Sequence, residues 1–130
     1  MKGKILIIEK DDTIRTLLKM HLKSSGYNVN ESSCFNQGLY SLNDNSYDII
    51  VIEITDISKE DETILKQFKN ENFKSRPLLV GVLKSASQNI IEQSISLMTL
   101  LDRFIVPPFN FAEFIETIDQ MVILRSKIKV

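Results

Sequence analysis

The sequence predicts a doubly wound α/β domain, in which five parallel strands form one sheet with helices on both faces. Two observations predict it. Short apolar runs of strand length alternate along the chain with segments that have the apolar period of a helix. Four of the five runs are rich in Ile, Leu and Val with little polar alternation, which is typical of parallel strands buried on both faces. Right-handed crossovers between such strands leave few topologies.

The expected strands are KILIIE (4–9), YNVNE (27–31), DIIVIE (48–53), PLLVGV (77–82) and RFIV (103–106). The YNVNE run alternates between apolar and polar residues, so we expect it at an edge of the sheet. The other four runs are expected to be buried on both faces.

We expect helices over 11–26, 34–43, 60–70, 88–98 and 110–125. Asp11 or Asp12 can cap the first helix, and Gly26 can close it. The helix over 34–43 is the weakest of the five, because Gly38 interrupts it. The last helix starts at Asn110, which has an acid three residues later and so resembles a capping box.

The composition is that of one ordinary globular domain. The chain has 130 residues, of which 43% are hydrophobic and 25% charged. Its net charge of −1 argues against nucleic acid or an anionic membrane as a partner, and no apolar run is long enough to span a membrane. The single cysteine, Cys34, suits a reducing compartment. We therefore expect a cytoplasmic protein with one domain over 1–125 and a C-terminal tail over 126–130.

Ligands of such a sheet bind at the carboxyl ends of the strands, so the residues there are the candidate site. These are Glu9, Lys10 and Asp11 after the first strand, Glu53, Thr55 and Asp56 after the third, Val82 and Leu83 after the fourth, and Pro107 after the fifth. The sequence contains no Gly-rich phosphate loop, no nucleophile elbow and no metal-spaced Cys/His set. We therefore expect no enzyme.

Four segments resemble the receiver domain of bacterial two-component response regulators: KILIIEKDDTIRTLLKMHLKSSGYNV, YDIIVIEI, PLLVGV and FIVPPFNFAEFIETI. The resemblance covers nearly the whole chain and implies a flavodoxin-like fold. It also implies a chemistry, in which a histidine kinase transfers a phosphoryl group to an aspartate on the third strand. That carboxylate and a pair of acids after the first strand hold Mg²⁺. A Ser/Thr on the fourth strand and a Lys before the Pro-Phe pair contact the phosphoryl oxygens.

The resemblance places the acceptor at Glu53, the acid pair at Glu9 and Lys10, the hydroxyl at Val82 and the lysine at Pro107. Of these five positions only Glu9 carries the residue type that the family uses. The aromatic that moves on phosphorylation falls on Phe104, which is of the expected type.

These replacements predict that the phosphoryl chemistry is lost. Mg²⁺ needs oxygen ligands, and the Lys10 ammonium would repel it, so we expect Mg²⁺ binding to be weak or absent and no other cofactor to be bound. Phosphoryl transfer depends on positioning and charge neutralisation, which Val82 and Pro107 cannot supply. The simplest expectation is that Lys10 replaces the metal and lies against Glu53, Glu9 or Asp56. A solvated Lys10 is the alternative.

The leading hypothesis is a pseudo-receiver, a signalling module that works by protein–protein interaction without aspartyl phosphorylation. Its partner would be a histidine kinase or an output protein, or a second copy through the fourth helix, fifth strand and fifth helix. The first alternative is a working phosphoacceptor that uses Glu53 or a nearby acid, such as Asp56 or Asp48. A flavin or nucleotide binder on the same fold is a weaker alternative, because no phosphate-cradling loop is visible.

The segment SISLMTLLDRF carries more leucine than one buried stripe needs. The receiver family has a small Gly-Ala pair where this chain has Leu100 and Leu101. Extra core packing is one explanation. The other is an apolar docking face formed by Leu97, Leu100, Leu101 and Ile105 beside Phe104.

Overall fold

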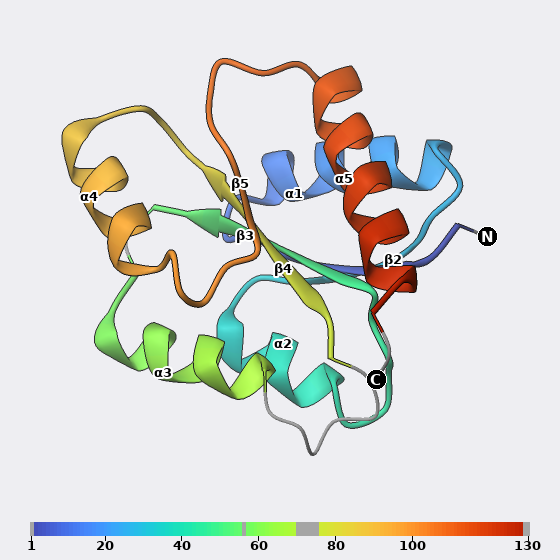
Figure 1. Cartoon of the computed structure of the whole chain (residues 1–130), viewed down its shortest axis with the longest axis horizontal. Coiled ribbons are helices and arrows are strands. Elements are labelled where there is room, and N and C mark those ends of the chain that lie inside the picture. The colour runs from blue at the N-terminus through green and yellow to red at the C-terminus, as the bar shows by residue number, and fades with distance from the viewer. Residues whose placement is uncertain (1, 56, 70–75, 129–130) are drawn as a thin grey trace.

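The computed structural model describes residues 2–55, 57–69 and 76–128. Five parallel strands form one sheet in the order β2-β1-β3-β4-β5 (Figure 1). The strands are β1 (Lys4–Ile8), β2 (Asn28–Ser32), β3 (Ile49–Ile54), β4 (Leu78–Leu83) and β5 (Arg103–Ile105). The helices are α1 (Asp12–Ser24), α2 (Phe35–Ser41), α3 (Lys59–Phe68), α4 (Gln88–Ser96) and α5 (Phe111–Ser126). The predicted doubly wound, flavodoxin-like α/β fold is confirmed.

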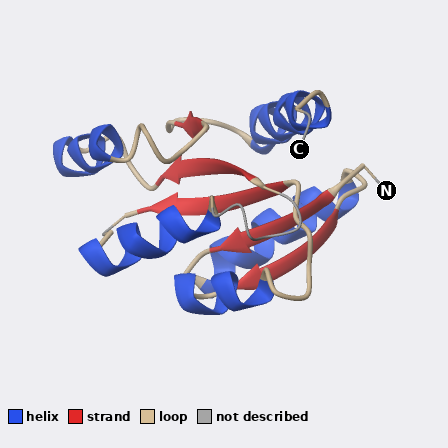
Figure 2. Cartoon of the chain, turned by 60° about the horizontal axis from the view of Figure 1, so that its bottom comes forward, coloured by secondary structure: helices blue, strands red, loops and turns tan. Residues whose placement is uncertain are grey.

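Helices flank the strands on both sides of the sheet (Figure 2). One core lies between the sheet and helices α1 and α5, and includes Leu22 and Phe114. The other lies between the sheet and helices α2 and α3 together with the segment after α4, and includes Leu65 and Phe68. Because successive strand residues point to opposite faces, one strand serves both cores, with Val51 on the first side and Ile52 on the second.

The strands at the two edges of the sheet are β2 and β5, and the burial predicted for β5 is wrong. β2 lies at an edge, as its polar alternation predicts. β5 forms the other edge and pairs only with β4. The predicted burial of RFIV on both faces is wrong, because only Ile105 of this run is buried. Arg103 and Val106 are exposed and Phe104 is only partly buried. The run is apolar enough for a central strand, but its place in the sheet leaves one side open.

Side chains cap three helices. The Asp11 carboxylate accepts a hydrogen bond from the Ile14 N–H at 2.9 Å and so begins α1. The Asn110 side chain accepts one from the Glu113 N–H at 2.8 Å and begins α5, and Ser58 begins α3 with a full capping box. These bonds satisfy N–H groups that have no partner inside the helix.

Gly38 does not end α2 but lets it approach β1. A Cβ at this position would lie 2.7 Å from Cδ1 of Ile8, which is closer than side-chain contacts allow. The glycine that weakens the helical pattern in the sequence therefore has a packing reason.

Within the residues that the structure describes, none of the helices has both the length and the apolar character that crossing a bilayer requires.

Candidate functional site

Glu9, Glu53 and Val82 lie side by side at the carboxyl edge of the sheet. Glu9 directly follows β1, and the register that pairs Ile8 with Ile52 puts it next to Glu53. Glu53 in turn pairs with Val82 on β4. The acceptor position, one acid position and the hydroxyl position that the resemblance implies are therefore brought together.

A cavity of about 160 Å³ lies beside these residues, on the side of the sheet that α1 and α5 cover. We call it the apolar cavity, because most of its wall is hydrocarbon from Ile14, Leu18, Val51, Val82, Phe109 and Phe111. Pro107 also lines it, and its charged wall residues are Glu9, Glu53 and Lys84.

A second cavity, of about 100 Å³, shares Glu9 and Glu53 with the first. We call it the polar cavity, and its other lining residues include Lys10, Ser33, Cys34, Asn36, Thr55 and Asp61. The two glutamates thus line both a space that is almost entirely hydrocarbon and one whose wall mixes these polar residues with Ile8, Phe35 and Ile57.

Glu9 is almost fully buried, with 3% of its surface exposed. Its Oε1 accepts a hydrogen bond from the Asp11 N–H at 2.9 Å. Its Oε2 has no hydrogen-bond partner among the described residues. Burial raises the pKa of Glu9 above its ordinary value of 4.5, while the Asp11 N–H and the charges of Lys84 and Arg15 oppose that rise.

Glu53 is half-buried at the end of β3. Its Oε2 likewise finds no hydrogen-bond partner within the described part of the chain. Two neighbouring strand ends therefore each hold a carboxylate oxygen that is shielded from water and unpaired, and groups of this kind are uncommon in native proteins.

The predicted pairing of Lys10 with Glu9 or Glu53 is wrong. Lys10 is exposed, and no ion pair within the described ranges joins it to either glutamate. Lys10 follows β1 in a bend, and although it lines the polar cavity together with both glutamates, it is exposed. The third predicted partner, Asp56, lies outside the described residues.

Two other cations act on Glu9 instead, and sequence reasoning missed both. Arg15 donates a hydrogen bond from Nη1 to the Glu9 carbonyl oxygen at 2.7 Å. Lys84, directly after β4, lines the apolar cavity and lowers the pKa of Glu9 by its charge, against the larger effect of burial. The rule that strand ends form the site would have found Lys84, had the search run one residue past Leu83.

The residues present fit the Mg²⁺ that the resemblance implies only poorly. Mg²⁺ takes six oxygen ligands in near-octahedral geometry. Glu9 and Glu53 each offer one free oxygen, but a lysine stands at the next acid position, and the described residues contain no group of three His, Cys, Asp or Glu placed to hold a metal. Val82 and Pro107 line the apolar cavity and have no side-chain oxygen to offer a metal.

The remaining predicted site residues do not gather at one point. Asp11 is engaged as the cap of α1, Thr55 lines the polar cavity, and Asp56 is outside the described residues. Phe104 is partly buried against the core on the α2 and α3 side of the sheet.

The predicted docking face is wrong, because its leucines belong to the core. Leu97, Leu101 and Ile105 are only 1%, 6% and 7% exposed, and Leu100 packs partly buried against the same core. A glycine on β4 makes room for them: a Cβ at Gly81 would lie 2.7 Å from Cδ1 of Leu101. The extra leucines are core packing, which is the other explanation that the sequence allowed.

Comparison with known proteins agrees with this geometry. No protein-family model matches the chain. Over 116 residues it is 29% identical to the probable transcriptional regulator ycf29 of Cyanophora paradoxa, covering 88% of this chain and 54% of that protein. It is 27% identical over 115 residues to the transcriptional regulatory protein SrrA of Staphylococcus aureus, covering 88% and 46%. The chain thus spans about half the length of the curated relatives it matches.

Solved structures match it over nearly its full length. The CheY-like response regulator receiver domain protein of Methanospirillum hungatei JF-1 superposes with a TM-score of 0.79 at 16% identity, covering 98% of this chain and all of that one. The receiver domain of sensor histidine kinase PA1611 from Pseudomonas aeruginosa PAO1, which holds a magnesium ion in its active site cleft, gives 0.74 at 19% identity, covering 92% and 97%. The chain therefore has the CheY-like fold of response regulator receiver domains.

Proposed function

We propose that the chain is a receiver-type signalling module of a two-component or phosphorelay system, which acts by contacting a protein partner and does not use aspartyl phosphorylation. The receiver fold and the similarity to two transcriptional regulators support the first half of this proposal. One observation carries the second half: the positions that would contact a phosphoryl group, Val82 and Pro107, contribute hydrocarbon to the apolar cavity beside Glu53.

Electrostatics argues in the same direction. A phosphoryl group on Glu53 would add negative charge next to Glu9, whose buried carboxylate already lacks a full set of hydrogen bonds. Phosphoryl transfer needs cations and donors placed around the transferring group. Val82 has no hydroxyl, and Pro107 has neither a charge nor an N–H. Lys84 remains, but it is exposed at the end of β4. The domain is accordingly expected to catalyse no transfer of its own.

A phosphodonor assay tests the chemistry. The chain is incubated with acetyl phosphate and Mg²⁺, and its intact mass is measured. We expect no gain in mass. The matched control is the variant Lys10→Asp, Glu53→Asp, Val82→Thr, Pro107→Lys, which restores the residue types that receivers use and should gain one phosphoryl group that hydroxylamine removes.

A stoichiometric, hydroxylamine-sensitive gain by the unmodified chain would instead support a working phosphoacceptor. The Glu53→Gln variant would then show whether Glu53 is the acceptor, because it should fail to gain the phosphoryl group only if Glu53 carries that group.

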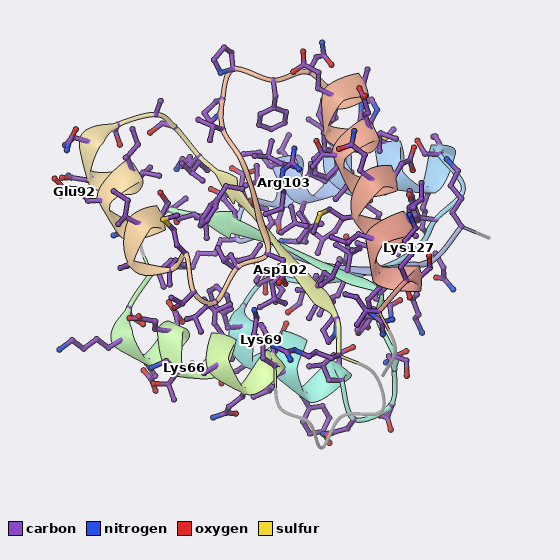
Figure 3. The ribbon with its side chains drawn as sticks, in the orientation of Figure 1. Lys66, Lys69, Glu92, Asp102, Arg103 and Lys127 are labelled. Atoms are coloured by element: carbon purple, nitrogen blue, oxygen red, sulfur yellow. The ribbon has the colours of Figure 1, made fainter. Side chains whose placement is uncertain are left out.

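We propose a histidine kinase or an output protein as the partner, bound through α4, β5 and α5. Figure 3 shows charged side chains on or next to these elements: Glu92 on α4, Arg103 on β5 and Lys127 just after α5. Reversing these three charges should abolish capture of a purified candidate partner. Lys66→Glu is the control, since Lys66 is an exposed charge on α3. Capture that survives the triple reversal places the partner elsewhere, and sedimentation of the chain alone tests a homodimer.

A further inference from the structure

Glu9 has a buried carboxylate oxygen with no hydrogen-bond partner among the described residues, and the proposed function does not explain it. Only 3% of the Glu9 surface is exposed, so its Oε2 is shielded from water. This oxygen also accepts no hydrogen bond among the described residues. A buried charge is ordinarily paired, because an unpaired one costs free energy that folding must offset. Glu53 presents a second such oxygen on the neighbouring strand.

The cations around these oxygens form no ion pair with them among the described residues. Arg15 already donates to the Glu9 carbonyl and to Asp12, and forms an ion pair with Glu31. Lys10 and Lys84 are exposed, and within the described ranges neither forms an ion pair with Glu9 or Glu53. The positive charge that would satisfy both carboxylates is therefore not supplied by these side chains.

The apolar cavity indicates what kind of cation would fit. Its volume of about 160 Å³ is similar to that of an engineered protein cavity, roughly 150 Å³, that binds benzene, so it suits a body of about six heavy atoms. Its walls are the hydrocarbon of Leu18, Val82 and Phe111 among others. Mg²⁺ keeps several of its waters, and those waters need polar partners that such walls do not offer.

We propose that the apolar cavity binds a small organic cation, with a primary ammonium group between Glu9 and Glu53 and a short aliphatic body against Leu18, Val82 and Phe111. The ammonium donates to the two unpaired Oε2 atoms, and the aliphatic body displaces water from hydrocarbon walls. This binding goes beyond the proposed function and does not depend on it, since either result of the phosphodonor assay leaves the cavity and its carboxylates in place.

Titration of the full chain with n-butylammonium chloride, followed by calorimetry, tests this site. We expect saturable binding at one site. 1-Butanol has nearly the same shape but no charge, so its affinity should be lower by at least about tenfold. That is the scale of one lost charge-assisted hydrogen bond. Added MgCl₂ should not displace the ammonium.

Three variants locate the binding. Glu9→Gln removes the buried charge, and Val82→Phe fills the cavity, so each should weaken n-butylammonium binding by about tenfold or more. Glu53→Gln provides a second charge variant in case Val82→Phe fails to fold. Glu116→Gln is the matched control, because Glu116 is an exposed acid on α5 outside this cavity, and it should bind as the unmodified chain does.

Four results would overturn the proposal. Equal binding of n-butylammonium and 1-butanol would mean that the cavity recognises only hydrocarbon. Displacement by MgCl₂ would make the glutamates a metal site. Absence of saturable binding to the folded chain, or binding that Glu9→Gln and Glu53→Gln leave unchanged, would remove the site altogether.

Discussion

Glu9 is a position where the residue type agrees with the resemblance to receiver domains, and it is almost fully buried. It keeps the acid type, but its carboxylate lies between the Asp11 N–H on one oxygen and no partner among the described residues on the other. Burial raises the pKa of Glu9 by more than the Asp11 N–H, Lys84 and Arg15 lower it, so the pKa lies above its ordinary value. A raised pKa makes the stability of the domain depend on pH.

The first prediction concerns that dependence. Between pH 4.5 and the higher pKa of Glu9 in the folded state, the folded chain holds more protons than the unfolded chain, so this group makes stability fall as pH rises. The contribution is complete above the folded pKa and absent below 4.5. Glu9→Gln should remove it, so the variant should gain melting temperature relative to the unmodified chain as pH rises through this range.

Thermal unfolding of both proteins from acid to neutral pH measures the effect, and Glu116→Gln is the control for a solvated acid. A difference in melting temperature that stays constant with pH would show that Glu9 titrates alike in the folded and unfolded chains.

A second prediction at the residue scale concerns Gly81 and Leu101, which share one space. A Cβ at Gly81 would meet Leu101 Cδ1 at 2.7 Å, so Gly81→Ala should destabilise the fold by about 1–3 kcal/mol through overpacking. Leu101→Ala should cost about 2–5 kcal/mol through the cavity it leaves. The double variant should lose less than the sum of the two.

Urea unfolding of the four proteins in this cycle gives the coupling energy. Additive losses within about 0.5 kcal/mol would mean that the two side chains do not compete for the same volume.

At the scale of elements, Asp102 joins α3, β4 and β5. Its Oδ2 accepts the Leu79 N–H at 2.8 Å, and its own N–H donates to the Leu79 carbonyl at 2.8 Å. Its Oδ1 lies 3.6 Å from Nζ of Lys69, which follows α3 (Figure 3). The backbone acceptor and the ion pair are two separate roles of one carboxylate.

The third prediction separates these roles. Asp102→Ala leaves the Leu79 N–H without its acceptor and should cost about 1–3 kcal/mol. Lys69→Met removes only a partly exposed ion pair and should cost about 0–1 kcal/mol. Urea unfolding measures both, with Lys66→Met as a control for an exposed lysine on α3. Equal losses for Asp102→Ala and Lys69→Met would assign the main effect to the ion pair.

At the scale of the whole molecule, two cores share one sheet. The α1 and α5 side and the α2 and α3 side are built from alternate residues of the same strands, so neither core can be lost while the sheet remains folded. A domain of this size with such a shared sheet should unfold in one cooperative transition.

The fourth prediction tests that cooperativity. Ile64→Val on α3 and Ile118→Val on α5 remove one methyl from opposite cores, and each should cost about 0.5–1.5 kcal/mol. The pair should add to within about 0.5 kcal/mol. Far-ultraviolet and tyrosine near-ultraviolet circular dichroism should give the same midpoint in every variant. Separate midpoints for the two signals would show that the cores unfold independently.

The sequence by itself determined the architecture and the location of the candidate site at the carboxyl ends of the strands. The alternation of apolar runs with helical segments predicts the parallel sheet, and the rule that ligands bind at strand ends leads to Glu9, Glu53, Val82 and Pro107, which line one cavity. These features follow from local periodicity and from the geometry of parallel strands, both of which can be seen in a few consecutive residues.

Only the tertiary structure decided which charges meet and which apolar residues are buried. The charge of Lys84 lowers the pKa of Glu9, whereas Lys10 has no such effect, although Lys10 is the nearer of the two in sequence. Leu101 is buried because Gly81, twenty residues earlier on β4, leaves room for it. These outcomes depend on contacts between distant segments, and the free energy of such a contact is set by the space and solvation at both partners, which neither local pattern contains.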